Sequence, residues 1–224
     1  MTSPYLQIAR TGPLLTLTLA RPAQRNALNT ALCEQLLQAL DEASRDEHLQ
    51  LLVLDAQGPL FCAGADLKEF AGQAPDLAQA ARARRLELLQ RLTHTLREHR
   101  LPTLAVVHGA AIGAGANLAL CCDQVLIAST AYFHYPELAH GIDPSSMIPM
   151  LAQHLGRKQL TDVLWMGERI QAAQAQQWGL VSAVAEPGQL DTVRQQRCER
   201  LLSYPPQALQ SSKRAVLKAY PLSS

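Results

Sequence analysis

Two stretches of small residues, each following an apolar run, place the strongest constraint on how this 224-residue chain can fold. Residues 61–67 read FCAGADL and follow an apolar run at 51–56 and a Gly-Pro turn. Residues 108–117 read HGAAIGAGAN and continue an apolar run that begins at residue 104. Glycine and alanine allow a ligand to approach the backbone closely, and the start of a helix directs free N–H groups and a positive dipole end at one place. The sequence therefore indicates a site built from backbone amides.

Neither stretch matches a nucleotide-binding motif. The pair Gly113 and Gly115 is not followed by a third glycine at the spacing of a dinucleotide fingerprint, and no Gly-Lys-Ser or Gly-Lys-Thr occurs in the chain. Taken singly, each stretch can also be a tight connection between a strand and a helix that binds nothing. Only their combination favours a ligand site.

The hydrophobic pattern predicts short strands that alternate unevenly with helices. The strands are expected at residues 5–10, 14–19, 51–56, 104–108, 125–128, 132–135 and 181–185. Thr11-Gly12-Pro13 predicts a hairpin between the first two strands, and Asn29 is placed to cap a following helix. A long helix is expected from about 76 to 100, with one apolar face formed by Leu86, Leu89, Leu92 and Leu96.

The order of these elements is strand, strand, helix rather than strand, helix in strict alternation. This order favours an α/β fold made as a spiral of ββα units over a doubly wound sheet. Residues 1–186 are expected to form the spiral core, and residues 187–224 a C-terminal helical segment that serves oligomerisation.

Composition excludes several classes of function. The formal net charge is +1 and no basic run occurs, so binding to nucleic acid has little electrostatic support. No apolar stretch is long enough to span a membrane, and the first ten residues lack the pattern of an export signal. The five cysteines are odd in number and form no CxxC pair, which argues against a disulfide framework and a zinc site. A cytoplasmic location is expected.

Further motifs occur along nearly the whole chain in a fixed order. They are RPxxRNALN at 21–29, FCAGADL at 61–67, HGAAIGAG at 108–115, PE at 136–137, GI at 141–142, LG at 155–156, GERI at 167–170, GLV at 179–181 and PP at 205–206. In their order and spacing these motifs resemble those of the crotonase superfamily, the enoyl-CoA hydratase/isomerase family. The resemblance implies a crotonase-like spiral and an enzyme that acts on acyl-CoA thioesters.

The resemblance also implies which residues form the site. The backbone amides of Ala65 and Ala114 would hold the thioester oxygen and stabilise an enolate. Position 114 is usually glycine in the family, and alanine keeps the N–H while narrowing the space for the acyl chain. Lys68 can equally be a solvated helix residue. The substrate-binding residues implied are Ala27, Leu28, Ala65, Asp66, Leu67, Lys68, Ala114 and Asn117.

The carboxylates bear on the reaction. Hydratases of the family use two glutamates, and Glu137 in the Pro-Glu motif occupies the place of one of them. The other place holds Asn117, whose amide cannot exchange a proton at neutral pH. One carboxylate can carry a proton between C2 and C4 of an enoyl thioester, so isomerisation is favoured over hydration. Two alternatives stay open: Glu137 can be a carboxylate that merely starts a helix, and Asp143 near Ser145 can be a second acid.

No metal or separate cofactor is expected; coenzyme A would enter as part of the substrate. The spacing His134-x-x-Glu137-x-x-His140 differs from HExxH, and Pro136 interrupts a continuous helix. The two histidines stay candidates for a proton donor in the acyl pocket. Cys62 has no evident base partner and is interpreted as a packing residue.

Other functions compatible with the same features are enoyl-CoA hydration, acyl-CoA decarboxylation or hydrolysis, and non-catalytic binding of acyl-CoA. The RNA-binding branch of the family would need a basic cluster, which this sequence lacks. By resemblance, the expected assembly is a homotrimer or a dimer of trimers. The C-terminal segment is shorter than is usual for the family.

Overall fold

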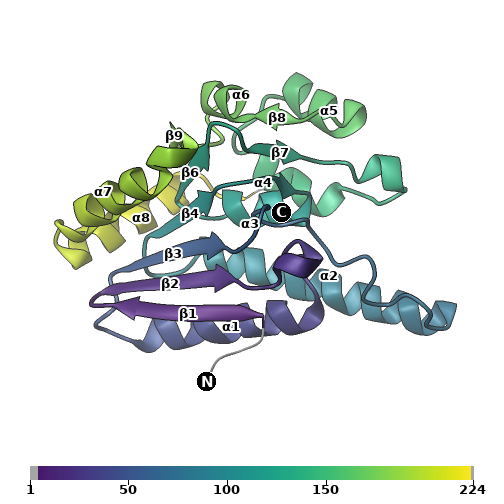
Figure 1. Cartoon of the computed structure of the whole chain (residues 1–224), viewed down its shortest axis with the longest axis horizontal. Coiled ribbons are helices and arrows are strands. Elements are labelled where there is room, and N and C mark those ends of the chain that lie inside the picture. The colour runs from purple at the N-terminus through teal and green to yellow at the C-terminus, as the bar shows by residue number, and fades with distance from the viewer. Residues whose placement is uncertain (1–4, 223–224) are drawn as a thin grey trace.

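The computed structural model describes residues 5–222, which form two sheets surrounded by helices (Figure 1). The larger sheet has the strand order β1-β2-β3-β4-β6-β9 and the smaller one the order β5-β7-β8. The strands are β1 (Leu6–Thr11), β2 (Leu14–Leu19), β3 (Leu51–Ala56), β4 (Thr103–Val107), β5 (Ala111–Ile112), β6 (Gln124–Ala128), β7 (Tyr132–His134), β8 (Ile170–Gln171) and β9 (Ala183–Ala185).

Helices separate these strands and close the chain. The α-helices are α1 (Thr30–Arg45), α2 (Pro75–Arg97), α3 (Ala114–Leu120), α4 (Ile148–Leu151), α5 (Arg157–Met166), α6 (Ala172–Gln177), α7 (Leu190–Leu202) and α8 (Pro206–Ala219). The short 3₁₀ helices are η1 (Pro22–Gln24), η2 (Leu138–His140), η3 (Ser145–Met147) and η4 (Pro187–Gln189). None of the helices described is long and apolar enough to cross a membrane.

The chain moves repeatedly from the large sheet to the small one and then into a helix. It passes from β4 to β5 to α3, and from β6 to β7 to η2. An isolated bridge between Cys62 and Ala111 brings the connection after β3 into the same small layer. Apart from the β1–β2 hairpin, neighbouring strands of the large sheet run parallel. The predicted spiral of ββα units is confirmed.

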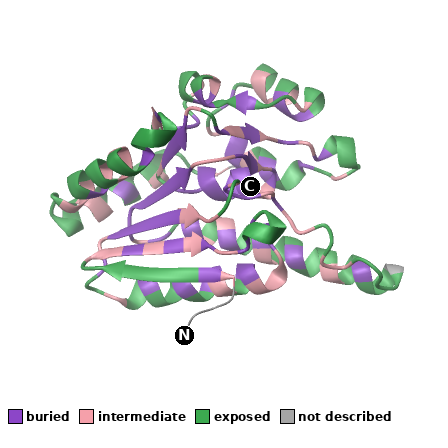
Figure 2. Cartoon of the chain, viewed as in Figure 1, coloured by how far each residue is buried: buried purple, intermediate pink, exposed green. Residues whose placement is uncertain are grey.

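Burial explains why some strands are continuously apolar and others alternate. The residues of β4 are all buried, as are the first four of β3, whereas β2 alternates buried and half-buried residues and most of β1 is exposed (Figure 2). Central parallel strands are covered on both faces, so both sets of side chains must be apolar. Helix α1 packs against β1, β2 and α2, and α7 packs against β3 and β6 (Figure 1).

Two local predictions are confirmed by the contacts that produce them. In the hairpin, Thr11 faces Leu14, and Gly12 takes a φ of +58° in the two-residue turn between them. Asn29 caps α1, because its side chain accepts a hydrogen bond from the Leu32 N–H at 3.0 Å.

The predicted apolar face of α2 is wrong at one position. Leu89, Leu92 and Leu96 are buried, but Leu86 is 45% exposed. The inward position at that level of the helix belongs to Arg85, which hydrogen-bonds to the Asp66 carbonyl and forms an ion pair with Glu69 at 3.3 Å. A buried arginine that reaches the first small-residue stretch therefore replaces the leucine in the apolar face.

The C-terminal helices are tied to the large sheet by two ion pairs. Arg194 of α7 pairs with Asp55 of β3, and Lys213 of α8 pairs with Asp123, each at 2.8 Å. The division into a core at 1–186 and an oligomerisation segment at 187–224 stays a prediction. Residues 1–4 and 223–224 of those ranges lie outside the described part of the chain.

Candidate active site

The first small-residue stretch presents a free amide at Ala65. Leu28 donates its N–H to the Gly64 carbonyl at 2.8 Å and accepts from the Asp66 N–H at 3.0 Å, which makes a parallel bridge between Leu28 and Ala65. In such a bridge the N–H of the middle residue points away from its partner. Among the hydrogen bonds of residues 5–222, none uses the Ala65 N–H as donor.

The second stretch presents a free amide at Ala114. Its backbone is held on both sides, because Ile112 donates to the Cys62 carbonyl at 2.9 Å and Gly113 donates to the His134 carbonyl at 2.8 Å. Helix α3 then begins at Ala114, and its first intrahelical hydrogen bond runs from the Asn117 N–H to the Gly113 carbonyl at 3.0 Å. The Ala114 N–H therefore belongs to the first turn, where helical amides have no partner within the helix.

The two stretches touch each other at Gly64. Gly64 has a φ of +87°, and a Cβ atom there would lie 2.7 Å from the Ile112 carbonyl oxygen and 3.6 Å from the Ala114 nitrogen. Only glycine allows this approach, and it places Ala65 next to the start of α3. Two free amides on touching segments are the donor arrangement that stabilises a developing oxyanion.

Glu137 lies against the same point. Its side chain is 8% exposed, and a Cβ atom at Gly113 would lie 2.0 Å from its Oε1 atom. Gly113 also has a φ of +51°, so both the conformation and the space require glycine. Glu137 precedes η2, but its side chain makes no capping hydrogen bond there. The carboxylate therefore faces the residue before Ala114 instead of stabilising a helix start.

Burial shifts the acidity of Glu137. Loss of solvent raises the pKa of its carboxyl group, while a hydrogen bond with its own backbone N–H and the charge of His140 lower the pKa by smaller amounts. A carboxyl group whose pKa moves toward neutrality can both accept and return a proton.

Asn117 lies one helical turn after Gly113 and is 6% exposed. Residues four apart on a helix share a face, so its amide lies on the side of α3 that Glu137 covers. The contacts bring Ala65, Ala114 and Glu137 together, and Asn117 lies one helical turn further along α3. Their chemical roles stay predictions.

Comparison with known proteins assigns the family. The family model described as enoyl-CoA hydratase/isomerase matches residues 10–223. The chain belongs to the enoyl-CoA hydratase/isomerase family.

Curated relatives of this family include proteins named as hydratases and proteins named as isomerases. The chain is 38% identical over 212 residues to 2,3-dehydroadipyl-CoA hydratase of Escherichia coli (strain K12), covering 94% of this chain and 81% of that protein. It is 31% identical over 189 residues to trans-2-decenoyl-[acyl-carrier-protein] isomerase of Streptococcus mutans, covering 83% of this chain and 71% of that protein. A solved enoyl-CoA hydratase of Mycobacterium smegmatis superposes with a TM-score of 0.88 at 30% identity, covering 96% and 83%.

The other substrate-binding residues predicted from the family differ in what their side chains can reach. Ala27 and Leu28 are buried, whereas Leu67 and Lys68 are exposed. The Asp66 carboxylate pairs with the buried Arg21 guanidinium at 3.1 Å, so it is already engaged within the protein. Of this group, Leu67 and Lys68 are the side chains that solvent, and hence a bound CoA, can reach.

Sequence reasoning missed two residues that anchor the segments next to the free Ala65 amide. Arg21 carries the ion pair to Asp66 and also hydrogen-bonds to the Ala27 carbonyl. Asn26 is fully buried and donates to the carbonyls of Gln57 at 2.7 Å and Leu60 at 3.0 Å. Both residues lie in the RPxxRNALN motif, so the motif could have marked them as important. It does not reveal which residues they contact.

The alternative acids and nucleophiles are placed less favourably. Asp143 is exposed, and hydrogen bonds from Ser145 lower the pKa of its carboxyl group, so it holds no proton to donate at neutral pH. A His134 ring nitrogen lies 2.9 Å from the Gly167 carbonyl, and His140 is exposed. Burial raises the pKa of the Cys62 thiol to about 12, so no thiolate forms near neutral pH. Within residues 5–222, no group of three His, Cys, Asp or Glu side chains could hold a metal ion.

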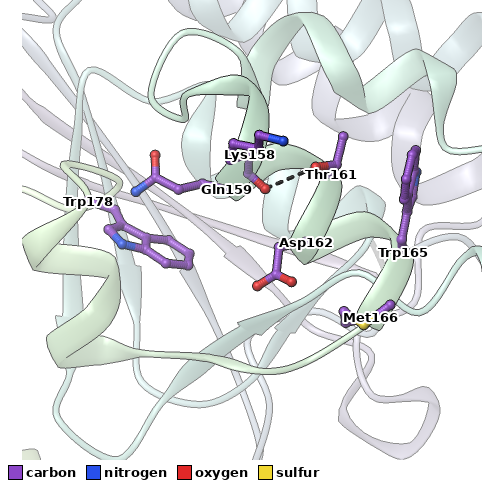
Figure 3. Close-up of a pocket in the computed structure, with 7 residues that line it drawn as sticks. All are labelled: Lys158, Gln159, Thr161, Asp162, Trp165, Met166 and Trp178. Carbon is purple, nitrogen blue, oxygen red and sulfur yellow. Dashed lines mark hydrogen bonds between the residues drawn. The ribbon is translucent and has the colours of Figure 1, made fainter.

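A surface hollow of about 440 Å³ lies apart from this site (Figure 3). It is formed along α5 and beside Trp178, and none of the predicted site residues lines it. Its lining residues are Lys158, Gln159, Thr161, Asp162, Trp165, Met166 and Trp178.

Proposed function

We propose that the protein moves the double bond of a 3-enoyl-CoA to the 2-position, with Glu137 as its single acid and base. The observation that carries the proposal is the contact between Glu137 Oε1 and Gly113, directly before the free Ala114 amide. The second position at which family hydratases have a glutamate holds Asn117, which cannot transfer a proton.

The reaction follows from these positions. The thioester oxygen accepts hydrogen bonds from the Ala65 and Ala114 amides, and each donor contributes on the order of 3 kcal/mol to the transition state. Glu137 takes a proton from C2, and the electron pair spreads over the thioester and the double bond as a dienolate. The protonated Glu137 then returns the proton at C4, which leaves a 2-enoyl-CoA. No water and no further cofactor is consumed.

Hydration of a 2-enoyl-CoA is the second candidate. It is favoured by the 38% identity to a protein named as a hydratase. Addition of water needs a base for the water and an acid for C2, and Glu137 alone would have to serve both steps. The Asn117 amide can orient a water molecule but cannot activate it.

The same proposal extends to the setting of the enzyme. Coenzyme A enters as part of the substrate, the protein works in the cytoplasm, and it assembles as a homotrimer or a dimer of trimers.

Replacement of Glu137 tests the proposed chemistry. Glu137→Gln keeps the shape of the side chain and removes the transferable proton, so isomerisation of a 3-enoyl-CoA should fall at least about a hundredfold. Asn117→Glu restores the second carboxylate and should add hydratase activity. Full isomerase activity in a folded Glu137→Gln variant would exclude the mechanism.

A further inference from the structure

An arginine occupies an apolar position of α2. Arg85 comes seven residues after Ala78 and four before Leu89, so it shares the face of the helix that those two buried residues line. It is itself only 7% exposed. A buried guanidinium costs free energy unless it is paired and hydrogen-bonded, so its partners should explain why the chain keeps a charge at this position.

The partners of Arg85 lie in the first small-residue stretch and just after it. Its Nη1 atom donates one hydrogen bond to the Asp66 carbonyl and another to Oε2 of Glu69, the second at 3.3 Å. The guanidinium also lies over the ring of Phe70, with its carbon 5.0 Å from the ring centre. One side chain of α2 therefore holds the turn that connects this stretch to α2.

Glu69 extends this attachment to α1. Its Oε1 atom accepts a hydrogen bond from the Thr30 N–H at 2.9 Å, while Oε2 faces Arg85. Thr30 is the first residue of α1, where helical N–H groups lack partners within the helix. Because α1 packs against α2 (Figure 1), the carboxylate and the guanidinium join two neighbouring helices to the same turn.

The backbone of this turn has little other support. Within residues 5–222, the only backbone hydrogen bond that leaves residues 66–73 runs from the Asp66 N–H to the Leu28 carbonyl. The remaining ones join residues within the turn itself. Further support from distant parts of the chain must therefore come from side chains such as Arg85.

Asp66 links the turn to the free amide. Leu28 donates to the Gly64 carbonyl at 2.8 Å, and this carbonyl belongs to the same peptide unit as the Ala65 N–H. Leu28 also accepts from the Asp66 N–H at 3.0 Å, which closes the bridge. Arg85 holds the carbonyl of Asp66 at the end of the bridge where the chain leaves for α2. Without that bond the bridge can open from this end, and the Ala65 amide then loses its orientation.

We propose that Arg85 is a positioning residue of the reaction, which keeps the Ala65 amide aligned by holding Asp66 from α2. The inference rests on the proposed binding of the thioester oxygen to that amide. Arg85 acts through the backbone of the turn, because its guanidinium is bound there and shielded from solvent. A donor stabilises an oxyanion only at the correct distance and angle, so a loose turn lowers the catalytic rate more than the substrate affinity.

Two adjacent arginines of α2 provide the variants for the test. Arg85→Met keeps a long apolar side chain and removes every donor. Arg84→Met is the matched control, because the Arg84 side chain is 75% exposed and lies 3.9 Å from Glu34, outside the turn. Both substitutions are made in the full chain, and circular dichroism checks that the variants fold.

Hydrogen–deuterium exchange of the unliganded protein measures the turn directly. Mass spectrometry follows a peptide that covers residues 61–70, with the fully buried strand β4 as the internal reference. Arg85→Met should speed exchange in residues 61–70 by about tenfold or more, since a hydrogen bond to a charged group is lost. Arg84→Met should leave it unchanged, and β4 should exchange at the wild-type rate in both variants.

A bound thioester reports the alignment of the amide. Hexanoyl-CoA with an isotopically labelled carbonyl is saturated, so it binds without a double bond to move. Hydrogen bonds from the two amides should shift its infrared carbonyl band to lower frequency in the wild-type protein. Arg85→Met should remove about half of this shift, because one of the two proposed donors loses its alignment.

Kinetics with a 3-enoyl-CoA should show the same loss of alignment. Arg85→Met should lower kcat by about tenfold or more and change KM by less than about threefold. Arg85→Lys keeps the charge but ends one bond short of Nη1, so it should recover part of the lost kcat.

The exchange experiment can overturn the proposal in two ways. Unchanged exchange in residues 61–70 of Arg85→Met would mean that Arg85 does not hold the turn. Equal acceleration in β4 would mean that Arg85 only stabilises the fold as a whole. If Arg85→Met does not fold, Arg85→Lys takes its place: exchange in residues 61–70 should then rise by about threefold, and an unchanged rate would overturn the proposal.

The two spectroscopic measurements do not depend on turnover, so they separate this inference from the proposed function. Faster exchange without a shifted carbonyl band in the wild-type protein would support Arg85 as the residue that holds the turn and refute the proposed oxyanion hole. A shifted band together with unchanged exchange in Arg85→Met would refute the role of Arg85 alone.

Discussion

Gly113 and Glu137 are packed so tightly that a methyl group on residue 113 would lie 2.0 Å from the carboxylate Oε1. The glycine brings the Glu137 carboxylate to the start of α3, directly before the free amide of Ala114. One residue therefore positions both the proposed catalytic carboxylate and the proposed oxyanion donor.

Gly113→Ala should abolish activity by displacing Glu137. It should also destabilise the protein by roughly 1–3 kcal/mol, because the residue has a positive φ that a side chain strains. Gly179→Ala is the matched control, since Gly179 has a φ of +77° and open space around its Cβ position. Denaturant unfolding should report a loss of stability in both variants, and an assay should report a loss of activity only in the first.

Substitutions at Ala65 separate the backbone donor from the side chain. Ala65→Gly keeps the N–H and should change turnover little, whereas Ala65→Pro removes the N–H. Loss of one donor in an oxyanion hole typically lowers kcat by about 10²–10³-fold. Circular dichroism must first show that the proline variant is folded; a folded proline variant with undiminished kcat would mean that another group holds the oxygen.

The raised pKa of Glu137 predicts how stability depends on pH. Burial favours the neutral carboxyl group, so between the unfolded and the folded pKa the native state binds more protons than the unfolded state. Wild-type stability should therefore decline as the pH rises from the unfolded pKa through the folded pKa. Glu137→Gln has no such proton to lose, so melting curves of the two proteins should diverge over this window, with the variant the more stable at neutral pH. Parallel melting curves would contradict a buried, raised carboxyl group.

The protonation of Glu137 should affect activity and stability in opposite directions: as the pH rises, stability should fall and kcat should increase. The base form of Glu137 begins the reaction, so kcat should fall as the pH is lowered through its raised pKa. This acidic limb, measured with a 3-enoyl-CoA, should lie above the pH at which an ordinary solvent-exposed glutamate titrates.

The expected assembly can be tested on α8, where Val216 is 56% exposed and Tyr220, just after the helix, is 61% exposed. Light scattering at micromolar concentration should give a trimer or a multiple of a trimer. If α8 contributes to the contact, Val216→Glu should weaken the assembly. Leu77→Glu, at a residue of α2 that is 67% exposed, should have no effect on it. A stable monomer would contradict the expected assembly.

The meeting of the two small-residue stretches could be predicted from the sequence. Both follow strands of apolar residues, and β3 and β4, being parallel neighbours, deliver residues 61–67 and 108–117 to the same edge. Motif order also predicted that Glu137 would lie near them. The same resemblance pointed to the amides of Ala65 and Ala114, which have no hydrogen-bond partner in the described part of the chain; their role stays a prediction.

The contacts that fix the site were beyond sequence patterns, because they join residues far apart in the chain. Arg21, at the start of η1, and Asp66, in the first small-residue stretch, are 45 residues apart. Their ion pair forms only when the fold brings these two segments together. Periodicity placed Leu86 on the buried face of α2. Arg85 is buried there instead, because its guanidinium hydrogen-bonds to the Asp66 carbonyl of the first small-residue stretch. The two-residue strands β5 and β8 were too short to produce any periodic signal.

A direct comparison of two reactions in the unmodified protein tests the central claim. The purified enzyme is given a 3-enoyl-CoA and, separately, a 2-enoyl-CoA of the same chain length, and kcat/KM is measured for isomerisation and for hydration. With one carboxylate at Glu137 and an amide at Asn117, isomerisation should be the faster by at least about tenfold. Faster hydration that persists in Glu137→Gln would contradict the account and transfer the acid/base role to another residue.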